Sequence, residues 1–479
     1  MVDINQKLRR SLRESKTARW TALALVSFTM LCGYYLADVM SPLKTLLELP
    51  PSQGGLGWDS SAYGFFTSAY GWINVFLLML IVGGMILDRM GMRFTGTMAA
   101  TVMIIGAGVK YWAITHDFGG VVYSFFGTPA GAQLVWASVG YAIFGFGVEV
   151  AGITVSKVVV HWFKGKEIAL AMGLQVAVAR VGMGIAIAFA PMIAFIQPFT
   201  ISRPVLLGLI LMCIGLLTYL VFCVMDTRLE KQLHETEPEA EEPFRFRDIL
   251  SIMRVRGFWL VALLCVLFYS AVFPFMKYAA DLMVNKFNVP DKWMGLIPAI
   301  LPVGTMLMTP FFGNLYDRRG RGADIMIVGA AMIVAIHAAF AIPSLSWWPV
   351  ALVLMALLGV SFSLVPSAMW PSVPKIIPEN KLGTAYSLIF WIQNWGLMGV
   401  PFLVGKVLDR YCVVQAGTKE IISDTGQVLE PAGRTLYDYT LPMLIFALFG
   451  VAAVIVALML RREDARKGFG LQQPNIKKG

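Results

Sequence analysis

The chain has 479 residues, of which 57% are hydrophobic and only 14% are charged. Soluble globular proteins carry about 25% charged residues, so this composition excludes an ordinary soluble domain and predicts a protein embedded in lipid. The formal net charge of +10 does not indicate a nucleic-acid partner, because the basic residues fall in short segments that flank long apolar runs, where membrane topology accounts for them.

The apolar runs are long enough to form helices that cross the ~30 Å hydrocarbon core of a bilayer. In chain order, the sequence predicts twelve spans, at residues 19–43, 61–87, 94–114, 132–162, 168–195, 204–225, 257–283, 293–316, 324–343, 347–377, 382–408 and 438–460. Most of the 39 Lys and Arg residues lie in the two tails and in alternate loops. This bias predicts an all-α membrane protein with both termini in the cytoplasm.

A polar segment divides the spans into two sets of six. Residues 227–256 form the longest inner loop, and the Glu-rich stretch 230–242 lacks apolar periodicity, which predicts a flexible or partly helical linker. The expected organisation is a cytoplasmic tail (1–18), a six-helix bundle (19–226), the linker (227–256), a second six-helix bundle (257–461) and a cytoplasmic tail (462–479). The outer loop 412–437 has no evident role.

One short motif occurs in both halves. Its first copy, after the second span, contains Gly84, Asp88, Arg89, Gly91 and Arg93; the second copy, after the eighth span and at one fixed offset, contains Gly313, Asp317, Arg318 and Gly320. We expect the first glycine of each copy to let neighbouring helices approach closely, the second glycine to allow a tight loop, and the aspartates to cap or face a helix N-terminus. The motif resembles the signature loop of the major facilitator superfamily, which implies two bundles that rock around a central site.

Further segments resemble one branch of that superfamily, the lysosomal dipeptide transporters. They are residues 146–149, 161–182, 271–275, 369–371, 382–386 and 393–394. The segment 37–42 in the first span and both tails depart from the pattern of this branch. The resemblance implies transport of dipeptides, with Glu149 and Arg180 at the positions that hold the two charged ends of the substrate.

The positions of Glu149 and Arg180 also suggest a site without reference to any family. A charge at the centre of a spanning helix costs ~2.5–3.5 kcal/mol, so each such residue is a functional candidate. Each of the two lies ~20 Å from the inner turn that joins their helices, which places them at one depth. Three interpretations stay open: an ion pair between the helices, a site for a zwitterion, or proton coupling by Glu149 with Arg180 as its partner.

Other polar residues in the spans permit two readings each. Asp38, Lys110 and Lys277 lie in the outer third, where they could form an outer gate or reach the interface as snorkelling side chains. Asp38 is also a candidate substrate-binding residue. Lys157 lies nearer the cytosol and fits an inner gate or snorkelling equally well. His337 is expected to be a packed core histidine.

A set of aromatic and amide side chains could complete a pocket for a peptide-sized solute. Each taken singly is more typical of helix packing or of an interfacial belt. They lie on spans one, seven, ten and eleven, and the candidate binding residues among them are Tyr34, Tyr35, Tyr269, Phe273, Trp370, Trp391, Gln393 and Asn394.

The sequence therefore predicts an alternating-access transporter of dipeptides or similar zwitterions, acting as a uniporter or coupled to protons. The alternatives are a proton-coupled organic-anion or sugar carrier, and a non-transporting sensor or scaffold. The dispersed cysteines and the lack of phosphate-loop and metal motifs predict no enzyme, no cofactor and no metal. We expect a monomer. Because the chain has no Asn-x-Ser/Thr sequon and no acidic dileucine signal, the bacterial inner membrane is favoured over a lysosomal or other organelle membrane.

Overall fold

A computed structural model describes residues 14–125, 128–163, 167–233, 246–378, 381–417, 421–422, 428–430 and 434–474. The helices of the first half are α2 (Lys16–Asp38), η1 (Ser41–Leu43), α3 (Lys44–Leu47), η2 (Pro51–Gln53), α4 (Ser60–Ser68), η3 (Ala69–Gly71), α5 (Trp72–Phe76), α6 (Met79–Thr115), α7 (Ala132–Phe163), α8 (Ile168–Ala194) and α9 (Ser202–Leu233). Those of the second half are α10 (Phe246–Met253), α11 (Arg256–Phe287), η4 (Asp291–Trp293), α12 (Ile300–Arg319), α13 (Gly322–Ala341), α14 (Trp348–Ile376), α15 (Leu382–Tyr411) and α16 (Thr440–Lys467).

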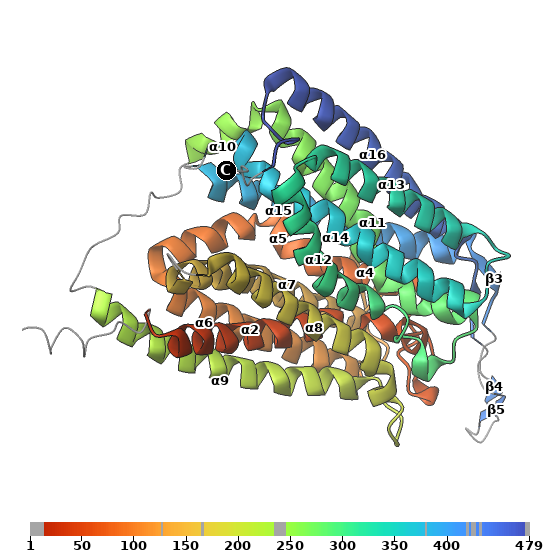
Figure 1. The fold of residues 1–479 in the computed structure, drawn as a ribbon. Helices are drawn as coiled ribbons and strands as arrows, with labels where there is room; N and C mark the ends of the chain where they lie inside the picture. The colour runs from red at the N-terminus through yellow and green to blue at the C-terminus, as the bar shows by residue number, and fades with distance from the viewer. Residues whose placement is uncertain are drawn as a thin grey trace, which may run out of the picture.

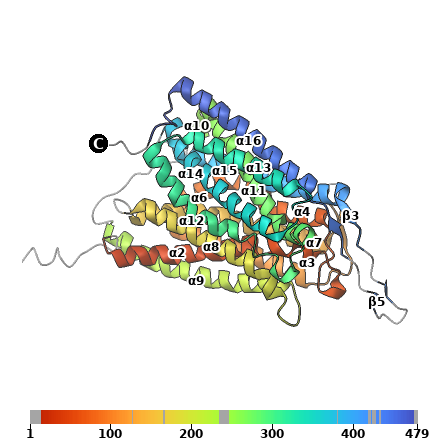
Figure 2. The same cartoon turned by 45° about the vertical axis from the view of Figure 1, so that its right-hand side comes forward.

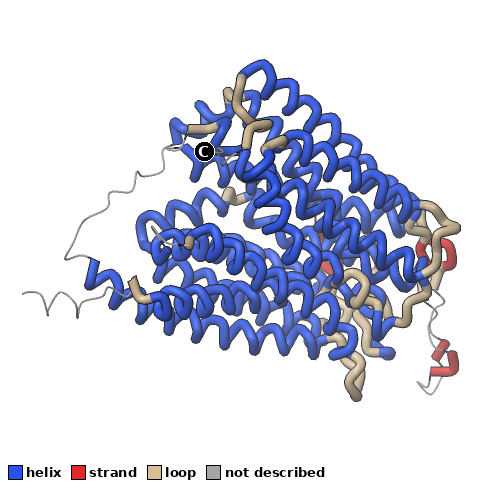
Figure 3. The backbone as a smooth tube through the Cα atoms, in the orientation of Figure 1, coloured by secondary structure: helices blue, strands red, loops and turns tan. Residues whose placement is uncertain are grey.

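Short strands occur only in loops among the described residues. The antiparallel pair β1 (Val122–Phe125) and β2 (Thr128–Gly131) precedes α7. Four more form the pairs β3 (Val413–Gln415) with β6 (Leu436–Tyr437) and β4 (Ile421–Ile422) with β5 (Val428–Glu430). The second group lies at the end of the molecule away from the chain termini (Figure 3). We call that end the outer end and the end with both termini the inner end.

The helices form two bundles, one from each half of the chain (Figure 1). The first contains α2 and α6–α9, and the second contains α11–α16. In the view turned by 45°, α2, α8 and α9 lie on one side of the molecule and α13, α14 and α16 on the other (Figure 2). Large apolar side chains cover the outside of both bundles; on α9 they include Leu217, Val221 and Val224, which are 61%, 53% and 56% exposed. Such an apolar exterior suits lipid as the solvent.

Within the described residues, ten helices are long and apolar enough to cross a membrane. The two further spans expected from the sequence are present but atypical. The second span is broken into α4, η3, α5 and the first part of α6, and α6 itself contains a break at Gly91 that separates the second span from the third. The eighth span is α12, which carries an internal Pro310 and a charged inner end. The predicted fold class is confirmed.

The two bundles contact each other at the outer end. There α4 packs against α15, and α11 packs against η1 and α3. A Cβ added to Gly64 would lie 2.7 Å from the backbone oxygen of Pro401, and one added to Gly405 would lie 2.3 Å from that of Ser60. Side chains at these glycines would separate the bundles, so the outer end is closed, and the bundles diverge toward the inner end (Figure 1).

The repeated motif lies at the inner end, and its glycines behave in two ways. Gly91 and Gly320 have φ values of 77° and 68°, which confirms that they form tight turns that favour glycine. Nothing lies within 4 Å of a Cβ added to Gly84 or Gly313, so the predicted close helix approach at these glycines is wrong for this conformation. The reason is that the inner ends of the bundles, where these glycines lie, are apart.

Several segments interpreted from the sequence lie outside the described residues. These are 1–13 and 475–479 of the tails, 234–245 of the linker and parts of the outer loop 412–437. The described parts of the linker are largely helical: residues 227–233 continue α9, and α10 begins at Phe246. The described C-terminal segment is fixed to the second bundle, since the backbone N–H groups of Arg321 and Gly322 donate to the carbonyls of Gln472 and Leu471.

Candidate functional site

Glu149 lies on α7 inside the first bundle, half-buried. The hydroxyl of Tyr70 donates a hydrogen bond of 2.9 Å to its Oε1 atom. Tyr70 can reach it because the second span is broken at η3, and because Gly145 lets α7 approach: a Cβ there would lie 2.3 Å from the Tyr70 carbonyl oxygen. Within the described part of the chain, no cation pairs with Glu149.

Arg180 lies on α8 and reaches across to the second bundle. Its guanidinium lies over the rings of Phe273 and Phe362, with Cζ 5.1 Å and 5.5 Å from their centroids. Its Nη1 is 3.7 Å from the sulfur of Met183, which is a weak acceptor. Among the described residues, Arg180 has no carboxylate partner, so most of its five donors are available to a ligand.

The open interpretation of an ion pair between Glu149 and Arg180 does not apply to this conformation, because the two charges are held by different neighbours. Tyr34 on α2 lies within electrostatic range of both. The result is two opposite charges that are not paired with each other, and each unneutralised charge within a spanning helix is costly. Such an arrangement suits a ligand that carries both charges itself.

Aromatic side chains of the second bundle form the wall beside Arg180. The ring of Tyr269 lies 5.4 Å from those of both Phe273 and Phe362, and the indole N–H of Trp370 donates to the Tyr269 hydroxyl at 3.1 Å. Trp370 in turn packs on Phe390 with a centroid distance of 4.9 Å. The structure thus brings together Tyr269, Phe273 and Trp370 from the predicted set.

A barrier of polar contacts lies between this region and the outer end. Lys277 of the second bundle forms an ion pair of 2.6 Å with Asp38 of the first, and donates at 3.3 Å to the hydroxyl of Tyr141. Tyr141 lies 5.6 Å from the ring of Tyr70, the partner of Glu149. Lys110 is fully buried beneath Tyr141 and donates to the Leu36 carbonyl at 3.2 Å, so it does not snorkel to the interface.

Four predicted binding residues take part in other contacts. The Tyr35 hydroxyl donates to the Pro204 carbonyl inside the first bundle, and Gln393 accepts from Cys265 inside the second. Asn394 donates to the Phe390 carbonyl of its own helix. Trp391 donates to the Val75 carbonyl and so joins the two bundles. The structure does not bring these residues to the Arg180 group.

The charged residues of the inner motif lie outside the central region. Asp88 accepts from Lys157 at 3.2 Å, which links the second and fourth spans of one bundle. Arg93 donates to Thr227 at 2.9 Å. Asp317 is half-buried at the end of α12, and Arg89 and Arg318 are exposed.

His337 is fully buried, and its Nε2 lies 2.9 Å from the Ala271 carbonyl, which confirms a packed core histidine.

Sequence reasoning missed Tyr70, Tyr141 and Phe362. Each is an aromatic residue among many in a spanning segment, so composition alone does not distinguish it. A signal existed only for Tyr70, which lies in the second span beside Gly71, where a broken helix turns a side chain toward the interior.

Two helical bundles that meet at one end, with charged side chains inside the spanning helices, have the architecture of a membrane transporter. The chain belongs to the Major Facilitator Superfamily, whose family model matches residues 23–401. Proteins of this family are membrane transporters, not enzymes. The chain is also similar to the lysosomal dipeptide transporter MFSD1 of Mus musculus, with 28% identity over 403 residues, 82% of this chain and 80% of the relative.

Further relatives and solved structures agree with this assignment. MFSD1 of Gallus gallus is 31% identical over 279 residues, 57% of this chain and 62% of the relative. An inward-facing, unoccupied bacterial homologue of the human lysosomal transporter Spinster superposes with a TM-score of 0.69 at 14% identity, over 94% of this chain and 98% of that one. A POT family transporter in complex with a thioalcohol-conjugated peptide gives 0.65 at 14% identity, over 93% and 96%. At this identity the solved structures establish the fold alone.

Proposed function

We propose that this transporter carries dipeptides or closely similar zwitterions, with Glu149 binding the ammonium end and Arg180 the carboxylate end. The observation that carries the proposal is the Arg180 guanidinium, which faces the second bundle over two aromatic rings and has no carboxylate partner in the described structure. Its planar, forked donors match a carboxylate in bidentate geometry. The names of the MFSD1 relatives support the same substrate class.

The aromatic wall supports a peptide substrate of variable sequence. Rings of Tyr269, Phe273 and Trp370 accept apolar side chains of different shape without requiring a fixed hydrogen-bond pattern. An organic anion would meet Arg180 but also the carboxylate of Glu149, which repels it. A neutral sugar would leave both charges without a partner. The zwitterion is therefore the ligand that satisfies both groups.

Dipeptides with one end blocked provide the test. We measure binding to purified protein by calorimetry for Ala-Ala, its N-acetyl form and its C-terminal amide, with the parent, Glu149→Gln and Arg180→Ala. Hydrogen bonds to charged groups contribute about 1.5–3 kcal/mol, so each block should weaken binding to the parent by at least about 10-fold. Arg180→Ala should bind the acid and the amide equally weakly, and Glu149→Gln should no longer distinguish the free from the acetylated amine.

The matched control is Arg410→Ala, which removes an exposed arginine from α15. It should bind all three ligands as the parent does. If Arg180→Ala still prefers the free acid, Arg180 does not hold the carboxylate. A parent that ignores dipeptides but binds a monoanion or a neutral sugar would favour the alternative carrier.

We also propose the domain division at 19–226 and 257–461, a monomeric carrier, and both termini in the cytoplasm of a bacterial inner membrane. The basic inner loops support the orientation, and the division is supported by the separate bundles (Figure 1). Labelling of single cysteines in whole cells tests the orientation: Ser346→Cys in the loop after α13 should react with an impermeant maleimide, and a cysteine at Gly468 should not.

A further inference from the structure

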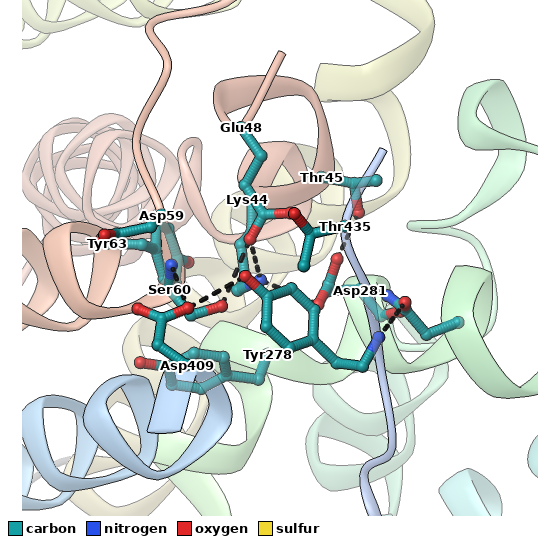
Figure 4. Close-up of polar contacts among 12 residues, drawn as sticks. Lys44, Thr45, Glu48, Asp59, Ser60, Tyr63, Tyr278, Asp281, Asp409 and Thr435 are labelled. Atoms are coloured by element: carbon teal, nitrogen blue, oxygen red, sulfur yellow. Dashed lines mark hydrogen bonds and ion pairs between the residues drawn. The ribbon is translucent and has the colours of Figure 1, made fainter. Parts of the chain in front are cut away.

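A second group of buried charges lies at the outer end, and Figure 4 shows its polar contacts. Lys44 of α3 forms ion pairs of 2.6 Å with Glu48 and 2.9 Å with Asp281. The side chains of Lys44 and Asp281 are 0% exposed, and that of Glu48 is 9% exposed. One ammonium thus serves two carboxylates, and the three groups carry an excess negative charge in a site with little water.

The other charged and titratable groups around Glu48 do not remove this excess. Asp409 of α15 is a third carboxylate, and it accepts from the backbone N–H groups of Ser60 and Ser61 and from the Tyr437 hydroxyl. Arg434 is already engaged by Asp291, at 3.0 Å and 2.6 Å. The remaining neighbours are the exposed Asp59 at the start of α4 and the phenols of Tyr278, Tyr437 and Tyr439.

The donors are distributed unequally between the two carboxylates that share Lys44. Asp281 accepts from Lys44, from the hydroxyl of Thr45 at 2.6 Å and from that of Tyr439. Glu48 accepts from Lys44 and from Ser60 at 3.2 Å, both through Oε1, while its Oε2 atom is buried without a partner. An ionised oxygen in that position is poorly stabilised, so a proton is held most favourably by Glu48.

Closure of the outer end creates this environment. Lys44, Glu48 and Ser60 belong to the first half of the chain, whereas Asp281 and Tyr437 belong to the second. When the halves separate, Glu48 meets water and no longer faces Asp281. We propose that Glu48 is a proton-binding site of the outer gate, protonated when the outer end is closed and deprotonated when it opens.

The direction of the pH dependence follows from linkage. Burial raises the pKa of Glu48, which lies just outside the first spanning segment, from 4.5 to about 7 in the closed state. The closed state therefore holds the proton more tightly, its extra stability is fully present below pH 4.5, and it is lost as the pH rises through 7. An acidic outer solution thus favours the closed outer gate, so that transport is linked to protons at a point remote from the substrate.

The test measures the gate directly and uses no substrate, so it can fail independently of the proposed cargo, although it relies on alternating access. Spin labels at Ser124→Cys and Ser346→Cys, in a Cys213→Ser background, report the distance between the outer ends of the bundles by pulsed electron resonance. With pKa values of about 7 closed and 4.5 open, the closed-to-open ratio should rise roughly 70-fold from pH 8 to pH 5.

Variants separate the role of Glu48 from general effects of acid. Glu48→Gln should stay closed at every pH and lose the pH dependence, whereas Asp117→Asn, at an exposed outer carboxylate, should behave as the parent. If Glu48→Gln folds poorly, Glu48→Asp keeps a titratable group and should shift the midpoint. An infrared band of a protonated carboxylic acid should be present in the parent at pH 5 and absent in Glu48→Gln.

Two results would overturn the proposal. One is an unchanged pH dependence of the label distance in Glu48→Gln. The other is a gate that responds to Na⁺ concentration at constant pH and not to pH itself, since a metal cation would then be the ligand of these carboxylates.

Discussion

At the scale of single residues, the central question is how a charged side chain without an ion-pair partner is stabilised and oriented within a spanning helix. Arg180 is held by the faces of Phe273 and Phe362, which stabilise a cation without occupying its hydrogen-bond donors. Glu149 is oriented by one phenol, which leaves its other oxygen available. Each contact positions the charged group and leaves polar atoms of that group available for a further hydrogen bond.

The Tyr70 hydroxyl gives a prediction at this scale. Tyr70→Phe removes the 2.9 Å hydrogen bond to Glu149, which should weaken dipeptide binding by roughly 3- to 10-fold, given about 0.5–1.5 kcal/mol for one hydrogen bond. The matched control is Tyr35→Phe, because within the described structure the Tyr35 hydroxyl donates to the Pro204 carbonyl. The control should lower thermal stability and leave affinity unchanged; equal losses of affinity in both variants would argue against a positioning role for Tyr70.

At the scale of elements, the broken second span determines where the two bundles can meet. The short helices α4, η3 and α5 replace one straight helix, and α4 packs closely on α15 through Gly64 and Gly405. A Cβ added to Gly84, in the inner part of the same span, would have nothing within 4 Å. In the state with the outer end closed, Gly64 of this span is therefore packed against the other bundle, whereas Gly84 of the same span is not.

Alanine at these glycines should shift the conformation in opposite directions. Gly64→Ala places a Cβ 2.7 Å from a backbone oxygen and should open the outer end. Gly84→Ala meets nothing within 4 Å and should leave this state unchanged, while hindering the state in which the inner ends meet. The spin-label distance at the outer end should lengthen in the first variant and not in the second. Lengthening in Gly84→Ala would contradict this assignment.

At the scale of the whole molecule, buried ion pairs between the bundles hold the outer end shut. The Lys277–Asp38 pair is connected to Glu149 through a chain of contacts. Lys277 donates to Tyr141, the ring of Tyr141 lies against that of Tyr70, and Tyr70 donates to Glu149. Buried pairs give little net stability compared with apolar packing, but loss of one partner leaves an uncompensated charge. Replacing one partner of such a pair should therefore destabilise the protein more than replacing both partners.

This asymmetry can be measured with a double-mutant cycle. Asp38→Asn alone removes the carboxylate partner of the half-buried Lys277 ammonium. It should lower the thermal midpoint of the purified protein, with a loss of about 3 kcal/mol in the free energy of unfolding. Adding Lys277→Met should restore much of the loss. The single variants and the double variant are compared with the parent; a double variant less stable than both singles would show that the pair does not act as a unit.

The sequence by itself predicted a helical membrane protein, a division into two halves and two charged residues, Glu149 and Arg180, within apolar spans. These predictions were possible because apolar length, charge bias and repeats are local properties of the chain. It could not determine which aromatic residues surround Arg180, since Phe273 and Phe362 lie on helices of the other bundle. Nor could it distinguish Tyr70 and Tyr141 from other aromatic residues.

Only the tertiary structure decided that the two central charges are separate and that the outer end is closed. It also revealed Glu48, Lys44 and Asp281 as one group, although Asp281 lies on α11 and the other two on and beside α3. The physical reason is that contacts between bundles depend on the conformational state as well as on the chain. The same reason explains why the predicted approach at Gly84 and Gly313 is absent, while a close approach at Gly64 and Gly405, which the sequence did not predict, is present.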